Sequence, residues 1–172
     1  TSVFIAGAGP IGLLILKMAK IYGVQHVVVM DINKERLKIV TEMGGMAVSS
    51  KEELLEIAPN EGFDIAIDAI GLTVTRQQCM EITKRAGTII FTGLHSSDSS
   101  LPINAAIRDE LTLKGAFAYA PSDFKNALSF IEQGFVDLSP WTVTYSLEQG
   151  KECFEKLISD PGKIAKILLK IN

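Results

Sequence analysis

Three glycines near the start of the chain have the spacing of a phosphate-binding turn. Gly7, Gly9 and Gly12 follow a short apolar run and open a segment with helical periodicity, which is the setting that the G-x-G-x-x-G pattern requires. The first glycine allows a tight turn, the second lets a pyrophosphate approach the backbone, and the third lets helix and strand pack closely. Pro10 suits the first helical position, and the free N–H groups from Ile11 onward would face an anion. The pattern predicts a dinucleotide site, with a glycine-rich turn that binds nothing as the alternative.

An acidic residue lies where a dinucleotide-binding turn needs a partner for the ribose. Asp31 ends the second apolar run, roughly 20 residues beyond the glycines, where a carboxylate accepts hydrogen bonds from the adenosine ribose hydroxyls. A 2′-phosphate there would meet like charge, so the residue favours NAD over NADP. A helix-capping aspartate is the alternative, because a helical pattern follows. Arg36 is expected against the same ribose or adenine, or in solvent on that helix.

Small residues recur at the ends of later apolar runs, where the ligand crevice of a parallel sheet opens. Each of three such tripeptides is ordinary turn chemistry, but together they leave room for a flat ring to approach the backbone. We expect cofactor contacts at Ala69, Ile70 and Gly71, at Thr92, Gly93 and Leu94, and at Ala116 and Phe117, which follow Gly115.

The remaining polar candidates indicate structural roles rather than catalysis. His95 is expected in a surface loop and Cys79 is expected to pack within a helix. Asp64 and Asp68 alternate with apolar residues, and neither is assigned an acid–base role. The two histidines and two cysteines are scattered, whereas zinc needs three or four clustered ligands. We therefore assign no catalytic residue and no metal ligand to this chain.

The segments that position these residues alternate between short β-branched runs and longer helical patterns, which indicates βαβ units and a parallel sheet. Strands are expected at residues 3–6, 26–30, 46–48, 63–67, 88–92 and 111–117. Helices are expected at residues 10–22, 34–43, 51–57, 74–84 and 122–133, the last with Ser122 as its N-cap. The pattern predicts an α/β fold with a doubly wound six-stranded sheet of order 3-2-1-4-5-6, the Rossmann fold.

The end of the chain differs in pattern from the rest. We expect a dinucleotide-binding domain over residues 1–135 and a strand–helix–strand tail over residues 136–172, with strands at 141–144 and 164–171 and a helix at 147–159. Because six strands already complete a nucleotide-binding sheet, the tail either adds to that sheet or belongs to a neighbouring domain.

Length and composition restrict the class of protein. The chain has 172 residues, of which 47% are hydrophobic and 22% charged, as in a globular domain. A net charge of −3, from 17 basic and 20 acidic residues spread along the chain, argues against nucleic-acid binding, and no apolar run reaches the roughly 18–20 residues of a membrane span. The two separate cysteines favour a reducing compartment, so we expect a cytoplasmic protein. Because the chain opens with Thr1 rather than an initiator methionine and a strand-like run begins already at Val3, we also expect it to come from a longer protein.

With these motifs in place, the sequence resembles the cofactor-binding domain of medium-chain, zinc-type alcohol and polyol dehydrogenases. The likeness spans essentially the whole chain, and no single motif carries it. The segments that carry it lie at residues 3–12, 28–31, 68–71, 87–93, 113–117 and 162–169.

The resemblance implies a division of labour between two domains. Catalytic zinc, its ligands and the proton relay would belong to a domain preceding Thr1, which residues from about 136 onward complete, so this chain alone is expected to be inactive. The nicotinamide of NAD would lie against the backbone at residues 92–94 and 116–117, and Lys166 would reach the pyrophosphate, an outward-facing strand lysine being the alternative. The sixth strand would pair with its twin in a homo-oligomer, with a dimer as the expected form.

Two functions are compatible with these features of the sequence. The first is the NAD(H)-binding part of an oxidoreductase that transfers hydride between a secondary alcohol or polyol and NAD. The alternative is a free-standing regulatory module that senses NAD or another nucleotide. The tail and the small residues at the end of the sixth strand favour the enzyme, because a sensor needs neither.

Overall fold

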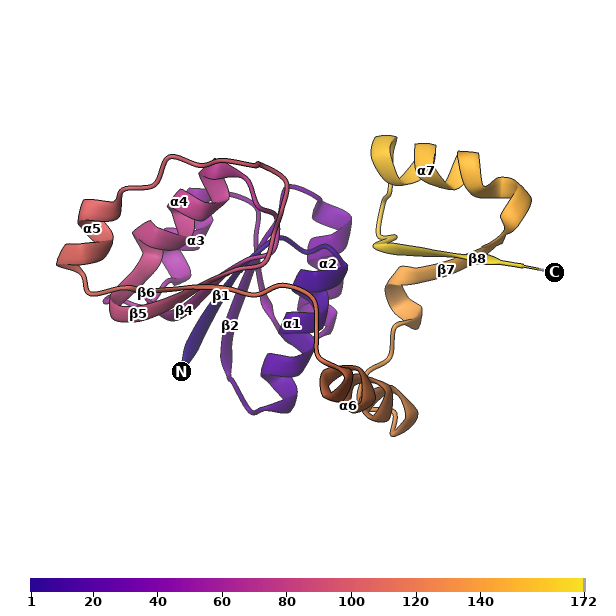
Figure 1. Ribbon diagram of the computed structural model, residues 1–172, viewed down its shortest axis with the longest axis horizontal. Helices are drawn as coiled ribbons and strands as arrows, with labels where there is room; N and C mark the ends of the chain where they lie inside the picture. The colour runs from indigo at the N-terminus through magenta and orange to yellow at the C-terminus, as the bar shows by residue number, and fades with distance from the viewer. Residues whose placement is uncertain (172) are drawn as a thin grey trace.

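Six parallel strands form the central sheet of the computed structural model, which describes residues 1–171 (Figure 1). The order β3-β2-β1-β4-β5-β6 confirms the predicted doubly wound arrangement, whose direction of winding reverses between β1 and β4. The strands are β1 (Ser2–Ala6), β2 (His26–Met30), β3 (Met46–Val48), β4 (Phe63–Asp68), β5 (Thr83–Phe91) and β6 (Thr112–Gly115).

Side chains that alternate along β1 divide the core into two layers. Val3 and Ile5 belong to a cluster with side chains of α1 and α2, whereas Phe4 and Ala6 belong to a second cluster with side chains of α3 and α4. Both faces of the strand are buried, which is why it appears in the sequence as a continuous apolar run. The helices between the strands are α1 (Pro10–Ile21), α2 (Lys34–Glu42), α3 (Lys51–Ile57), α4 (Thr73–Ile82) and α5 (Ile103–Arg108).

Two features between β4 and β6 differ from the prediction. β5 begins at Thr83 rather than at residue 88, because Thr83 pairs with Phe63 ahead of a register shift. The intervening residues include charged ones, so the segment lacks the apolar pattern of a strand. Helix α5 was not predicted, because its six residues are too few to show a helical period; Ala106 alone among them is buried.

The segment after β6 also corrects the prediction. Ser122 is not a helix cap: α6 (Pro121–Glu132) begins one residue earlier, with Ala120 as N-cap. The N–H of Ala120 donates to a carboxylate oxygen of Asp123 at 2.9 Å, and Pro121 fits the first helical position because it has no N–H to satisfy. β6 ends at Gly115, so the next two residues follow the strand rather than extend it.

The tail forms a small sheet of its own beside the main one (Figure 1, yellow). β7 (Thr142–Ser146) and β8 (Lys166–Lys170) pair in parallel and are joined by α7 (Gly150–Ser159), so the tail does not add to the six-stranded sheet. Trp141 and Ala165 are buried in the cluster that includes α1 and α2, which attaches the tail to the main sheet. The tail predicted over residues 136–172 ends at residue 172, which lies outside the described residues. No helix within residues 1–171 has the length and apolarity to cross a membrane.

Candidate functional site

The glycine turn between β1 and α1 is shaped by contacts that exclude side chains. Gly7 has a φ of +105°, and a Cβ there would come within 2.8 Å of the Ile70 side chain. A Cβ on Gly12 would overlap the carbonyl oxygen of Gly7, so the first turn of α1 lies directly against the loop. Gly9 differs, because a Cβ there would meet no atom within 4 Å. Its small size leaves open space beside the backbone, as close approach of a ligand requires.

The start of α1 faces this open space with unsatisfied N–H groups. Gly9 is the N-cap, Pro10 takes the first helical position, and no side chain caps the helix. The first intrahelical hydrogen bond runs from the N–H of Leu13 to the carbonyl of Gly9 at 2.9 Å. The N–H groups of Ile11 and Gly12 therefore stay directed out of the helix, where the helix dipole favours an anion.

Asp31 links the end of β2 to the glycine turn. One carboxylate oxygen accepts the N–H of Ala8 at 2.6 Å, and the other accepts the N–H of Asn33 at 2.8 Å. The capping alternative is wrong, because Asn33 is the N-cap of α2 and its side chain accepts the N–H groups of Glu35 and Arg36. A carboxylate has about four acceptor positions, so each oxygen of Asp31 retains one. Those positions suit the two hydroxyls of a ribose.

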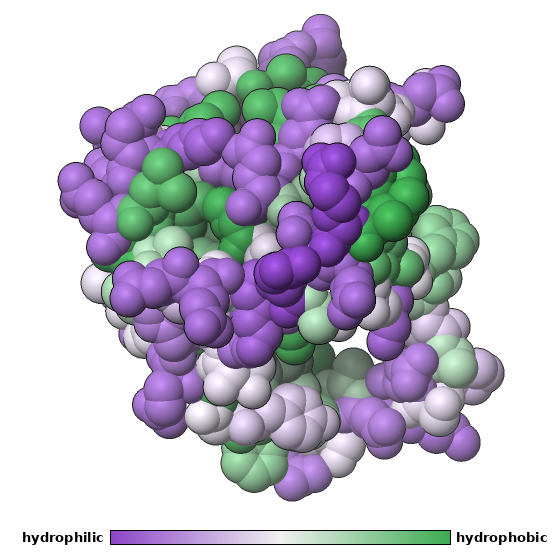
Figure 2. All heavy atoms as spheres, turned by 90° about the vertical axis from the view of Figure 1, so that its left-hand side faces the viewer, coloured by the Kyte–Doolittle hydropathy of each residue, from purple (hydrophilic) through white to green (hydrophobic). Residues whose placement is uncertain are grey.

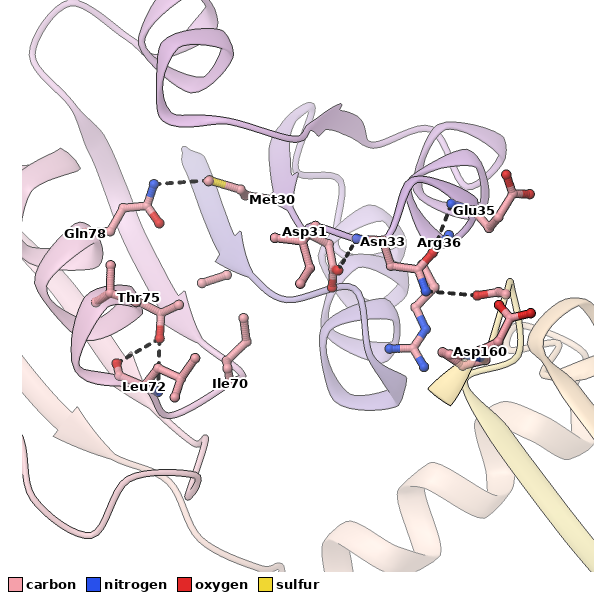
Figure 3. Close-up of a pocket in the computed structure, with 15 residues that line it drawn as sticks. Met30, Asp31, Asn33, Glu35, Arg36, Ile70, Leu72, Thr75, Gln78 and Asp160 are labelled. Atoms are coloured by element: carbon pink, nitrogen blue, oxygen red, sulfur yellow. Dashed lines mark hydrogen bonds between the residues drawn. The ribbon is translucent and has the colours of Figure 1, made fainter. Parts of the chain in front are cut away.

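A cavity of about 730 Å³ opens beside Asp31, at the carboxyl ends of β1, β2 and β4 (Figure 3). It lies where the winding of the sheet reverses, which is the usual ligand crevice of this fold. Its volume falls in the range of small-molecule and cofactor sites. The lining residues come from β1 and β2, from the β2–α2 and β4–α4 segments, and from the tail: Ala6, Met30, Asp31, Ile32, Asn33, Glu35, Arg36, Ile70, Leu72, Val74, Thr75, Gln78, Asp160, Pro161 and Gly162.

The tail closes one side of this cavity through two hydrogen bonds to the β2–α2 region. The Asn33 amide donates to the carbonyl of Gly162 at 3.0 Å, and the Arg36 guanidinium donates to the carbonyl of Ile164 at 3.0 Å. Figure 3 shows Arg36 between α2 and the tail, at the rim of the cavity. From the sequence, Arg36 was expected against the ribose or adenine, or in solvent. The structure places it on the cavity wall, half-buried and bound to the tail.

The second part of the predicted site lies at the ends of β4 and β5. The N–H groups of Thr92 and Gly93 both donate to the Asp68 carbonyl at 3.0 Å. Gly71, whose φ is +90°, lies backbone to backbone against Gly93, so a Cβ on either would overlap the other. The structure therefore brings residues 69–71 and 92–94 together. The Leu94 side chain is 73% exposed.

The third part, after β6, is held less closely. The N–H of Ala116 donates to the carbonyl of Phe91 at 3.0 Å, which places residue 116 beside the end of β5. The Phe117 side chain is 84% exposed. On β8, Lys166 is exposed and shares a cavity of about 350 Å³ with Pro10, so it lies near the start of α1 as the predicted pyrophosphate contact requires.

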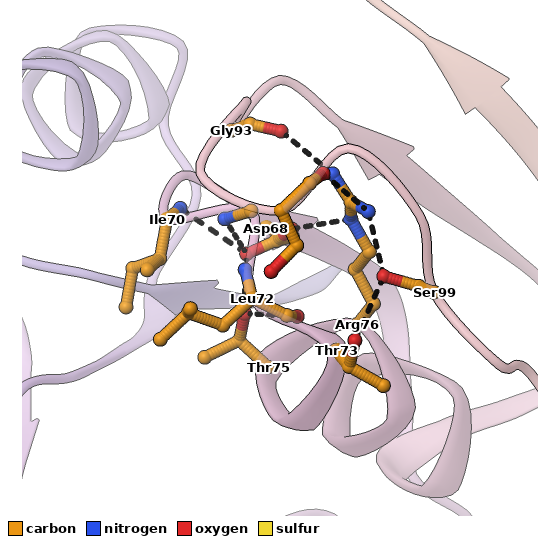
Figure 4. Close-up of polar contacts among 10 residues, drawn as sticks. Asp68, Ile70, Leu72, Thr73, Thr75, Arg76, Gly93 and Ser99 are labelled. Atoms are coloured by element: carbon orange, nitrogen blue, oxygen red, sulfur yellow. Dashed lines mark hydrogen bonds and ion pairs between the residues drawn. The ribbon is translucent and has the colours of Figure 1, made fainter.

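A buried ion pair, missed by the sequence interpretation, lies behind the β4–α4 turn (Figure 4). The fully buried Asp68 accepts the N–H groups of Ile70 and Gly71 at 3.1 and 3.0 Å and the Thr75 hydroxyl at 2.9 Å, all at one oxygen. Its other oxygen lies 3.6 Å from Nε of Arg76. An aspartate before a glycine turn is a signal for such backbone capture, but nothing local in the sequence identifies Arg76 as its partner.

Three other titratable residues lie away from the open crevice. Asp64 lies at the opposite end of β4, where the ammonium of Lys84 and the N–H and hydroxyl of Ser2 hold its pKa well below the usual range. Cys79 is buried, and burial, assisted by the charge of Asp68, raises its pKa well above the usual range, as expected of a packed thiol. His95 lies exposed in the loop after β5, as predicted.

Zinc has no place among the described residues. Within residues 1–171, no three His, Cys, Asp or Glu side chains lie close enough together to hold a metal ion. These residues therefore do not fit a zinc centre.

Comparison with known proteins agrees with this geometry. A model of the family described as "Zinc-binding dehydrogenase" matches residues 10–133. D-xylulose reductase A of Aspergillus niger is 33% identical over 172 residues, covering 94% of this chain and 48% of the relative. L-threonine 3-dehydrogenase of Colwellia psychrerythraea is 29% identical and covers 97% of this chain and 50% of the relative. The chain thus spans about half the length of the curated relatives it matches.

Solved structures show the same fold. A short chain alcohol dehydrogenase of E. coli CFT073, complexed with the cofactor NADH, superposes with a TM-score of 0.89 at 23% identity, covering 99% of this chain and 52% of that one. For 2R,3R-butanediol dehydrogenase from Bacillus subtilis the TM-score is 0.86 at 24% identity, covering 99% and 51%. Both likenesses establish the fold rather than the reaction.

Proposed function

The chain belongs to the zinc-binding dehydrogenase family, and from that premise we propose that it is the NAD(H)-binding domain of an oxidoreductase acting on a secondary alcohol or polyol. The observation that carries the proposal is the position of Asp31, whose carboxylate borders the crevice cavity with acceptor positions to spare. Relatives named for xylulose and threonine support a small hydroxylated substrate.

Different residues of the crevice are proposed to bind the adenosine, the pyrophosphate and the nicotinamide of the cofactor. Asp31 accepts the ribose hydroxyls, and the apolar side chains of Ile32, Leu72 and Val74 enclose the adenine. The N–H groups of residues 11 and 12 and the ammonium of Lys166 face the pyrophosphate, which passes the open side of Gly9. NAD supplies the hydride acceptor.

The nicotinamide end is proposed to lie against the main chain at residues 69–71, 92–94 and 116–117. Main-chain groups fixed there orient the ring and exclude water from one of its faces, which is the part that a protein contributes to cofactor chemistry. The catalytic zinc and its ligands are proposed to lie in another part of the protein, which residues 136–172 help to complete. Residues 1–135 are the dinucleotide-binding domain. On this proposal the chain by itself does not oxidise alcohols.

A homodimer formed through β6 is part of the proposal. All four residues of this edge strand are exposed, and α6, which follows it, buries none of its side chains. An open edge with little charge is suited to pairing with another strand. Two-fold pairing of β6 with its twin would offer the same surface from each subunit.

The free, separated cysteines support a cytoplasmic setting.

Isothermal titration calorimetry of the chain with NAD and NADP tests the cofactor. We expect NAD to bind more tightly by at least about tenfold, which corresponds to ~1.4 kcal/mol, because Asp31 repels a 2′-phosphate. Asp31→Asn should narrow that preference by weakening NAD binding and removing the repulsion of NADP. Asp98→Asn, an exposed loop substitution, is the control and should leave the ratio unchanged. Equal affinities in the unaltered chain would overturn the proposal.

A further inference from the structure

We propose that Arg76 is a positioning residue that fixes the main chain at Gly93 for the nicotinamide end of the cofactor. The inference rests on the proposed function and goes beyond it, because it concerns a residue that lies behind the site rather than in it. Its side chain is 13% exposed, and it comes from α4 rather than from any of the three tripeptides.

The guanidinium reaches three acceptors in the loop that follows β5 (Figure 4). It donates to the carbonyl of Gly93 at 3.1 Å, to the carbonyl of Ser96 at 3.3 Å and to the hydroxyl of Ser99 at 2.7 Å. Its Nε atom lies 3.6 Å from the buried carboxylate of Asp68. A planar group with several fixed donors is suited to holding several acceptors in one geometry.

These contacts fix the peptide groups of Gly93 on both sides. Its N–H is held by the Asp68 carbonyl and its C=O by Arg76. Thr73 and Gln77 of α4 also reach the loop, but they contact Ser99 and Ser100, several residues further on. Among the described side chains, Arg76 is the one that hydrogen-bonds to Gly93.

Loss of Arg76 should act on this end of the crevice and spare the other. Asp68 would keep its hydrogen bonds to Ile70, Gly71 and Thr75, so the β4 turn would stay in place. Asp31 and Ala8 make no hydrogen bond with Arg76, so the adenosine end should bind as before. A purely structural role would weaken both ends together, and this difference separates the two interpretations.

Backbone amide NMR of the 172-residue chain, titrated with NAD and with ADP-ribose, makes the distinction. In the unaltered chain, both ligands should shift the amides of Ala8 and Asp31, and NAD alone should shift those of Gly93 and Leu94. In Arg76→Met the shifts at Ala8 and Asp31 should persist, and the NAD-specific shifts should be lost.

Arg76→Lys is a second variant for the case that Arg76→Met does not fold, because it keeps a positive charge beside Asp68. One ammonium cannot reach all three loop acceptors, so this variant should also lose the NAD-specific shifts. The control is Arg85→Met, at a side chain that is 82% exposed and paired with Asp109. The inference would be overturned if Arg76→Lys kept the NAD-specific shifts in full. It would also be overturned if either Arg76 variant lost the shifts at Ala8 and Asp31 together with the NAD-specific shifts. So would NAD and ADP-ribose shifting the same amides in the unaltered chain, which would leave the adenosine site standing. If neither ligand shifted Ala8 or Asp31, the proposed function itself would fail.

Discussion

The β4–α4 turn and the β6–α6 segment both follow the carboxyl ends of sheet strands, but they differ in how firmly the rest of the chain holds them. Behind the first, Asp68 is fully buried, accepts hydrogen bonds from two backbone N–H groups and a hydroxyl, and forms an ion pair with a guanidinium group. In the second, every residue of β6 and most of α6 are exposed, including large apolar side chains such as those of Phe117 and Phe124. Figure 2 shows hydrophobic areas breaking through a mainly hydrophilic surface on the side that carries α5 and β6.

The difference indicates which parts of the site the chain determines by itself. A buried charge fixes its surroundings because removing any partner leaves an unpaired group in the interior. An exposed edge strand and helix fix little, since water competes for their polar groups and their apolar faces gain nothing from exposure. We therefore expect substitutions at the centre of the crevice to cost stability and substitutions at its edge to change assembly instead.

Asp68→Ala should have the largest effect. It would leave the N–H groups of Ile70 and Gly71 without their acceptor and the Arg76 guanidinium without its ion-pair partner, and we expect a loss of about 3–5 kcal/mol in the free energy of unfolding. Urea denaturation measures it. Asp98→Ala removes an exposed carboxylate from the loop after β5 and should cost less than about 0.5 kcal/mol. A cost below about 1 kcal/mol for Asp68→Ala would show that the centre is not held by this charge.

The glycine turn offers a matched pair of substitutions. Gly12→Ala places a methyl group on the carbonyl oxygen of Gly7 and should cost about 3 kcal/mol, because backbone must move to make room. Gly9→Ala enters open space at a φ of −73° and should change stability by less than about 0.5 kcal/mol. It should nevertheless weaken NAD binding, because the methyl group occupies the proposed path of the pyrophosphate. Similar stability losses in the two variants would contradict this account of the turn.

Asp64→Asn tests a pair at the other end of β4, far from the crevice. The carboxylate is 32% exposed, so solvent screens its contact with Lys84, and we expect a loss of about 1 kcal/mol at neutral pH. Because folding depresses the pKa of Asp64, its contribution is complete above the unfolded value of about 4 and is lost as pH falls through the lower folded value. The gap between the two proteins in urea melts should therefore close as the pH drops below about 4. A gap that stays constant across that range would rule out this role for the ionised carboxylate.

Leu113→Lys should have the smallest effect on stability and the clearest effect on assembly. Leu113 is 38% exposed on β6, so a lysine there should change the free energy of unfolding by less than about 0.5 kcal/mol. Like charges brought together across a two-fold axis should shift the proposed dimer toward monomer in sedimentation equilibrium. Lys125→Leu on the exposed α6 serves as a control for surface charge. A clean monomer for the unaltered chain at tens of micromolar would show that the edge does not pair.

Much of the fold could be predicted because its signals are local. Continuous apolar runs mark strands buried on both faces, and Gly7 and Gly12 lie where close contacts leave no room for a side chain. The spacing also predicted Asp31 at the end of the second strand, where it borders the cavity. The first residue of α6 was missed because Pro121 and the Asp123 carboxylate, rather than Ser122, organise that helix start.

Other parts depend on contacts between distant segments and could not be predicted. Asn33 bonds to Gly162, 129 positions away, so no window of sequence shows that the tail closes one side of the cavity. Arg76 meets Gly93 and Ser99 only after α4 has packed against the sheet. Its sequence neighbourhood is that of an ordinary helix arginine.

A crystal structure of the chain with NAD bound would test the central claim most directly, by showing which groups the cofactor touches. We predict that the carboxylate of Asp31 accepts the adenosine ribose hydroxyls while keeping its bond to Ala8, and that the pyrophosphate lies beside Gly9 at the start of α1. The nicotinamide should then lie against the main chain at Gly93. A cofactor bound elsewhere, or one whose ribose avoids Asp31, would contradict the account.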